Sequence, residues 1–199
     1  MAHAHDGNHD ALNAVGRLFA IGVALNVGFV ILEAVYGWRA GSLALLADAF
    51  HNLSDVGGLL LAWAGLAAGR LAPNERHTYG WRRGSILASF GNAVILLVAM
   101  GSLAWEAAQR LGTPVAIDGW TVVVVAAIGV VVNATTAALF FRGRKGDLNI
   151  RAAFLHMAAD ALVSLGVVAA GVLYLWLAWM WIDPTVSLVI AAVIVVGTW

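Results

Sequence analysis

Six long apolar stretches constrain the fold of this chain more than any other feature. They fall roughly at residues 15–36, 43–69, 85–108, 119–141, 152–178 and 183–199. Each is close to or above the ~20 residues that a helix needs to cross the hydrocarbon core of a bilayer. Only 11% of the residues are charged, whereas a soluble domain carries about a quarter. We therefore predict an all-α membrane protein with six transmembrane helices.

The basic residues predict how these helices are oriented. Two of the 11 lysines and arginines, Arg39 and Arg110, lie near one face of the membrane. The other nine lie on the opposite side: Arg17, Arg70, Arg76, Arg82, Arg83, Arg142, Arg144, Lys145 and Arg151. Basic loops stay in the cytoplasm, so both termini are expected there. We divide the chain into a polar, histidine-containing cytoplasmic tail (residues 1–14) and a transport domain (residues 15–199).

The helix boundaries follow from local signals. Gly37 to Gly41 is predicted to separate the first two helices. Asp183 is predicted to cap the sixth helix, with Pro184 at its first position. The fifth helix is expected to begin early, near Asp147 or Asn149, either of which could cap it.

Two apolar stretches each carry a histidine followed by an aspartate four residues later. These are His51 and Asp55 in the second stretch, and His156 and Asp160 in the fifth. The spacing puts both side chains of a pair on one helical face. Ionisable groups are costly in a bilayer and by default mark a functional site. Two facing helices would supply two imidazoles and two carboxylates, which complete a tetrahedral zinc shell.

Each pair alone could instead be structural, because a buried histidine or aspartate often bonds a neighbouring helix. Both pairs together, with matched spacing and order, favour a metal site. The same ligands bind protons, so metal and protons displace each other.

The two pairs can form one site only if they lie at the same depth in the membrane. His51 lies about eight residues below the outer end of its helix, and Asp160 about eight residues into the stretch 152–178. The pairs meet only if the fifth helix projects into the cytoplasm or the helices tilt.

Other polar residues in the apolar stretches allow more than one role. Asp48 shares the face of His51 and could support a ligand or carry protons, or pack with a water. Glu33 could lie on a proton path or at a helix interface. Asn26, Asn92 and Asn133 are interpreted as hydrogen-bonding groups between helices rather than ligands.

Composition excludes several other functions. The chain has no cysteine, which excludes disulfides, thiolate chemistry and sulfur-rich copper(I) sites. Its net charge is zero, without a long basic run, so nucleic acid is not an expected partner. His3, His5 and His9 in the tail could collect metal loosely.

These motifs resemble those of the cation diffusion facilitator family of divalent-metal transporters, and most closely its bacterial zinc, cobalt and cadmium efflux branch. The resemblance covers almost the whole chain from about residue 15. Besides the two histidine–aspartate pairs, it rests on the segments Gly41-Ser-Leu-Ala-Leu-Leu-Ala-Asp48, Glu75-Arg-His-Thr-Tyr-Gly-Trp-Arg-Arg83 and Trp181-Ile-Asp-Pro-Thr-Val-Ser187.

The resemblance implies a six-helix transmembrane domain in the bacterial inner membrane, a homodimer, and export of Zn²⁺ in exchange for H⁺, with Co²⁺ and Cd²⁺ as further substrates. It implies no enzyme activity and assigns the metal to His51, Asp55, His156 and Asp160. Histidine at the first position is associated in the family with a preference for zinc over cadmium. Zn²⁺ is thus a transported substrate rather than a resident cofactor.

The chain departs from the family in two places. Relatives continue into a cytoplasmic ferredoxin-like domain, which is absent after Trp199, so the chain is interpreted as a fragment or a minimal form. Of a second metal cluster found in some relatives, only His77 is present, and no second site is predicted. Two alternatives remain: a structural zinc that pins two helices, and an intramembrane zinc enzyme. Against the enzyme, catalytic zinc keeps an open position that four protein ligands would close.

Overall fold

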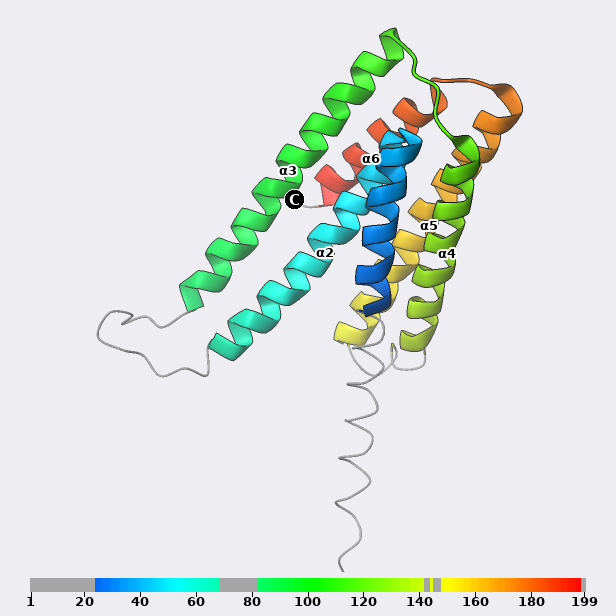
Figure 1. Ribbon diagram of the computed structural model, residues 1–199. Coiled ribbons are helices and arrows are strands. Elements are labelled where there is room, and N and C mark those ends of the chain that lie inside the picture. Colours follow the sequence, from blue (N-terminus) through cyan, green and yellow to red (C-terminus); the bar gives the residue numbers. More distant parts are fainter. Residues whose placement is uncertain (1–23, 69–81, 142–143, 145–147, 198–199) are drawn as a thin grey trace, which may run out of the picture.

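The computed structural model describes residues 24–68, 82–141, 144 and 148–197, and within these ranges it contains helices and turns but no strand (Figure 1). The first helix is described over residues 24–40. The five that follow are α2 (Leu43–Ala68), α3 (Arg82–Gly112), α4 (Gly119–Phe140), α5 (Leu148–Leu177) and α6 (Ile182–Gly197). The prediction of an all-α protein is therefore confirmed, and each of the six apolar stretches is helical over most of the residues that the structure describes.

Three of these helices contain segments that are long and apolar enough to cross a membrane by length and composition. The segments are Ile86–Gly112, Gly119–Phe140 and Ile150–Leu177. α6 is also apolar but has only 16 residues. The count of six membrane crossings stays a prediction. We call the end of the bundle at which α2 and α4 finish the inner end, following the orientation predicted from the basic loops, and the opposite end the outer end (Figure 1).

The turn between the first helix and α2 lies later than the sequence suggested. The helix continues through Gly37 to residue 40, so the break is shorter than the predicted segment 37–41 and begins at its last residue. A Cβ at Gly37 would lie 3.0 Å from Leu45 Cβ, so this glycine allows the two helices to approach closely. Gly41 makes the turn, with φ of +69°. The amide groups of Gly41 and Ser42 donate to Trp38 O and Gly37 O, the pattern of a Schellman motif.

Asp183 does not cap its own helix, which corrects the second boundary prediction. It lies in the first turn of α6, and its carboxylate accepts hydrogen bonds from the backbone of α2, at Leu43 N (2.8 Å) and Ala44 N (3.4 Å). The hydroxyl of Ser42 also donates to it, at 2.5 Å. The exposed amides at a helix N-terminus favour a negative charge. Asp183 therefore joins the outer ends of α2 and α6.

The helices divide into two groups. Among α2 to α6, α4 packs chiefly on α5, whereas α2, α3 and α6 pack on one another. Between the two groups, α6 also packs on α5, and α2 has few contacts with α5. Glycines bring α4 and α5 together: a Cβ at Gly171 would lie 2.8 Å from Val123 Cγ2, and one at Gly119 would lie 2.6 Å from Tyr174 Cδ1. Close approach at small residues is the usual way in which membrane helices associate.

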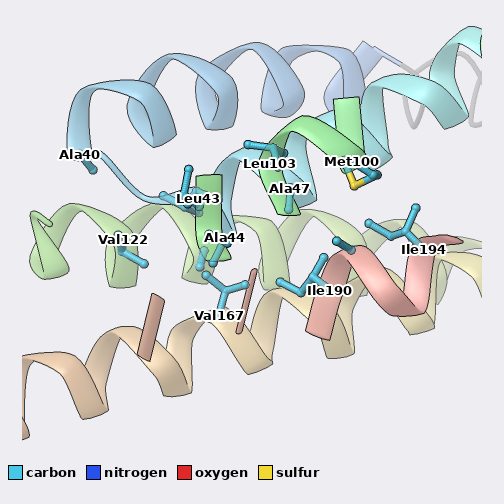
Figure 2. Packing of buried hydrophobic residues seen from close by; sticks show 14 of the residues in the cluster. Ala40, Leu43, Ala44, Ala47, Met100, Leu103, Val122, Val167, Ile190 and Ile194 are labelled. Carbon is cyan, nitrogen blue, oxygen red and sulfur yellow. The ribbon is translucent and has the colours of Figure 1, made fainter. Parts of the chain in front are cut away.

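A buried apolar cluster joins the two groups (Figure 2). It includes Leu43 and Ala44 of α2, Val122 of α4, Val167 of α5 and Ile190 of α6, which are between 0 and 7% exposed. The members from α2 and α4 lie within the first eight residues of their helices, so this part of the cluster fills the bundle towards its outer end. Leu96 of α3 and Ile194 of α6 extend the cluster further inward.

Candidate metal centre

The two histidine–aspartate pairs meet between α2 and α5. His51 Nε2 lies 3.6 Å from Asp55 Oδ2 in its own helix and 3.6 Å from Asp160 Oδ1 of α5. His156 Nε2 lies 3.6 Å from Asp160 Oδ2 and 3.2 Å from Asp55 Oδ2. The imidazole rings of His51 and His156 are 6.1 Å apart between centroids, edge to face. The structure thus brings all four sequence-predicted residues into one group, which we call the four-residue cluster.

The spacing of these atoms suits a zinc ion. Bonds of about 2.0–2.2 Å from Zn²⁺ to nitrogen and oxygen place neighbouring tetrahedral ligands about 3.3–3.6 Å apart. The four distances from a histidine nitrogen to a carboxylate oxygen run from 3.2 to 3.6 Å. Candidate ligand atoms of His51, Asp55 and Asp160 all lie within 4.8 Å of one another. Asp55 Oδ2 and Asp160 Oδ2 are buried and make no hydrogen bond within the described ranges. Carboxylate oxygens in this state are free to bind a cation.

A cavity of about 980 Å³ connects the four-residue cluster with the inner end. Its lining includes Phe140 at the end of α4, Ala153 near the start of α5 and Gly197 at the end of α6. Exposure differs across the cluster, since the side chain of His156 is 41% exposed and that of Asp160 only 2%. An ion that enters through this cavity would reach His156 early and Asp160 last.

The length of α5 resolves the mismatch in depth between the two pairs. α5 begins at Leu148 and has 30 residues, so it is about 45 Å long at 1.5 Å per residue, longer than a hydrocarbon core of about 30 Å. The expectation of an early start near residues 147–149 is confirmed. His51 and His156 each lie eight residues after the first residue of their helices, Leu43 and Leu148, which run in opposite directions.

Asp48 and Glu33 lie outside the four-residue cluster, and both are fully buried. Asp48 Oδ2 accepts a hydrogen bond from Ser164 Oγ of α5 at 3.1 Å. Glu33 Oε2 accepts one from Asn52 Nδ2 of α2 at 3.3 Å. Neither Ser164 nor Asn52 is among the residues predicted from the sequence. The sequence spacing could have indicated both residues. Ser164 follows Asp160 by one helical turn and Asn52 follows Asp48 by one turn, so each shares a helical face with a polar residue that was selected.

The asparagines behave in two ways. Asn92 of α3 donates to Ser54 O and Ser54 Oγ of α2, both at 3.0 Å, and Asn26 donates to Met157 Sδ of α5 at 3.7 Å. Their interpretation as groups that bond between helices is confirmed. The side-chain amide of Asn133 is buried without a hydrogen-bond partner in the part of the chain that the structure describes. The tail histidines, His3, His5 and His9, and also His77, fall outside the described residues.

Comparison with known families decides the affiliation of this chain. The model of the cation efflux transmembrane domain matches residues 19–199. The chain belongs to the cation efflux family. The resemblance that its motifs carry, to the zinc, cobalt and cadmium branch of bacterial cation diffusion facilitators, is confirmed.

Three curated relatives of this cation efflux domain show the range of functions in the branch. The zinc transporter ZitB of Escherichia coli is 37% identical over 204 residues, which is 100% of this chain and 64% of ZitB. The metal cation efflux system protein CzcD of Cupriavidus metallidurans is 31% identical over 198 residues, 100% of this chain and 61% of CzcD. A cadmium, cobalt and zinc/H⁺-K⁺ antiporter of Bacillus subtilis is 32% identical over 196 residues, 98% of this chain and 61% of that protein. The chain thus spans somewhat less than two thirds of these relatives.

Proposed function

We propose that this cation efflux domain transports Zn²⁺ across a membrane in exchange for protons, with Co²⁺ and Cd²⁺ as further candidate substrates. The observation that carries the proposal is the four-residue cluster, in which two imidazoles and two carboxylates from antiparallel helices lie 3.2–3.6 Å apart. The names of the relatives support the same substrate class. The proposed role is that of a transporter rather than an enzyme.

The ligand chemistry supports exchange. Zinc binds neutral imidazole and ionised carboxylate, so it competes with protons for all four side chains. An unperturbed imidazole titrates near pH 6.5, within the range that a membrane protein meets on its two sides. A site that has bound zinc releases it when protons occupy the same atoms.

The division of the helices supports alternating access. His51 and Asp55 belong to the group of α2, α3 and α6, while His156 and Asp160 belong to the pair α4 and α5. Movement of one group against the other would separate the two halves of the ligand set. With a cavity towards the inner end and an apolar cluster towards the outer end, the present arrangement corresponds to an inward-facing state.

Three finer features complete the proposal. The chain crosses the membrane six times with both termini in the cytoplasm, it lies in the bacterial inner membrane, and it acts as a homodimer. Large apolar side chains on α3 support contact with lipid. Among them, Ile95 is 71% exposed and Trp105 is 70% exposed.

Zinc flux into proteoliposomes tests the proposal. Loss of a residue that supports a metal ligand costs about 10–100-fold in affinity or activity. Loss of a ligand itself should cost more, so we expect the zinc flux of Asp160→Ala to be at least about 100-fold lower than that of the wild type. Glu106→Gln is the matched control, because Glu106 is 51% exposed and pairs with Arg110 near the outer end of α3. Flux from Asp160→Ala at the level of the control would contradict the proposed function.

A further inference from the structure

Two buried carboxyl groups meet one helical turn away from the four-residue cluster. Glu33 of the first helix and Asp48 of α2 lie within hydrogen-bonding contact of each other, and both are 0% exposed. Each is held by a neutral donor, Asn52 for Glu33 and Ser164 for Asp48. We call these two residues the carboxyl pair.

The surroundings of the carboxyl pair offer little compensation for two negative charges. Within the described ranges, Glu33 Oε1 and Asp48 Oδ1 are buried and have no hydrogen-bond donor. Among the residues that the structure describes, the other titratable groups that act on the pair are His51 of α2 and Asp160 of α5. Two ionised carboxylates in contact are unfavourable in a dry interior, and such pairs hold a proton between them. One proton reduces the charge from −2 to −1 and provides the missing donor.

The carboxyl pair lies on the outer side of the four-residue cluster. Asp48 precedes His51 by three residues on α2, and Ser164 follows Asp160 by four on α5. Both displacements point to the outer end, by about one helical turn of 5.4 Å. The large cavity is lined by His51 and Asp160 but not by Glu33 or Asp48. The cavity therefore reaches the cluster, and the carboxyl pair lies behind it.

A divalent cation in the four-residue cluster would act strongly on this pair. Charges about one turn apart in a water-poor interior interact far more strongly than in bulk water. A nearby positive charge favours the ionised form of a carboxyl group. Binding of Zn²⁺ thus favours loss of the shared proton, because the second negative charge then faces a cation.

We propose that Glu33 and Asp48 share one proton in the metal-free protein, and that zinc binding at the four-residue cluster releases this proton to water. The O–H bond of one carboxyl group breaks, its electron pair stays on the oxygen, and the pair goes from −1 to −2 as the cluster gains +2. The carboxyl pair is then a source of counter-transported protons separate from the metal ligands. This inference rests on the proposed function.

The experiment counts the protons released for each zinc ion bound by the purified full chain. Calorimetric titrations in buffers of different ionisation enthalpy give this number. In Glu33→Gln the new amide donates to an ionised Asp48, so the pair has its −1 charge without a titratable proton. We expect about one proton fewer per zinc than in the wild type, and a dependence of log Kd on pH that is shallower by about one unit. Zinc still binds, since all four ligands remain.

A second variant and a control complete the design. Asp48→Asn should give the same loss of one proton and keeps the test decisive if one of the two variants does not fold. Glu106→Gln makes the same chemical change at an exposed carboxyl group of α3 and should keep the wild-type count. A purely structural role of the carboxyl pair would change the affinity but not the proton count or the pH slope.

Three outcomes would overturn the inference. Wild-type proton counts in both variants would show that the carboxyl pair releases none. Zinc binding that releases K⁺ or Na⁺ from the wild-type chain, with the same proton count in the wild type and in both variants, would mean that the carboxyl pair holds a metal cation and not a proton. Absence of zinc binding by the wild-type chain, or undiminished binding by Asp160→Ala, would reject the proposed function as well. If Asp160→Ala loses zinc binding as expected, but Glu33→Gln and Asp48→Asn release as many protons per zinc ion as the wild type, only the inference about the carboxyl pair is rejected.

Discussion

The four candidate ligands differ in burial, and the difference suggests an order of binding. His156 is the most exposed member, at 41%, and Asp160 the least, at 2%, with His51 and Asp55 between them. An ion from the inner cavity would exchange water for imidazole before it reaches the buried carboxylate. Asp160 would then provide the last ligand, where water is least available to compete.

At this scale, one substitution tests what selects the metal. His51→Asp replaces an imidazole with a third carboxylate, which gives a more oxygen-rich and less tightly fitting site for the small Zn²⁺ ion. We expect Cd²⁺ to compete better against labelled Zn²⁺ uptake in this variant than in the wild type. A ratio that does not change would place selectivity outside the ligand set, for example in the shape of the cavity.

At the scale of single elements, the start of α2 depends on another helix. Three of its first amides, which have no partner within the helix, donate hydrogen bonds to side chains: Leu45 N to Ser42, and Leu43 N and Ala44 N to Asp183 of α6. Arg110 of α3 donates to Gly41 O in the preceding turn. The helix that carries His51 and Asp55 is therefore fixed at its outer end by residues from α3 and α6.

Replacement of Asp183 by Asn should destabilise the protein. The amide keeps one acceptor oxygen but loses the negative charge that the α2 N-terminus favours, and it leaves buried donors unsatisfied, at a cost of about 1–3 kcal/mol. Thermal unfolding in detergent measures this as a lower Tm than that of the wild type. A Tm equal to that of the wild type would mean that this contact contributes little to the fold.

The sequence predicted the helices and the grouping of four polar side chains better than the joints between helices. Apolar length indicated the helices, and the four-residue spacing selected His51, Asp55, His156 and Asp160, which the structure places together, because both signals are local. Their role as metal ligands stays a prediction. The cap that Asp183 gives to α2, and the contact between Glu33 and Asp48, join residues from different helices. Periodicity within one helix does not identify the partner on another. Gly37 shows a second reason why helix boundaries are hard to predict. In a sequence, a glycine that permits close packing of two helices cannot be distinguished from a glycine that ends a helix.

At the scale of the whole molecule, the cluster and the carboxyl pair lie on the same boundary. The contacts of Asp160 with His51 and of Ser164 with Asp48 both cross from α5 to α2, which otherwise have few contacts. In the proposed mechanism, metal and protons therefore act between the two helix groups. The apolar cluster towards the outer end joins the same groups, so opening on that side requires its separation.

Simultaneous recording of zinc and protons in one preparation tests the central claim most directly. Proteoliposomes that contain one dye for zinc and one for pH report both movements as zinc is added outside. Because protons compete for the same ligands, we expect zinc entry to make the interior more alkaline, and apparent zinc affinity to fall as external pH drops from about 7.5 to about 5.5, around the unperturbed imidazole value. Zinc entry with no proton movement, and an affinity that is flat across this range, would contradict exchange and indicate a uniporter or channel.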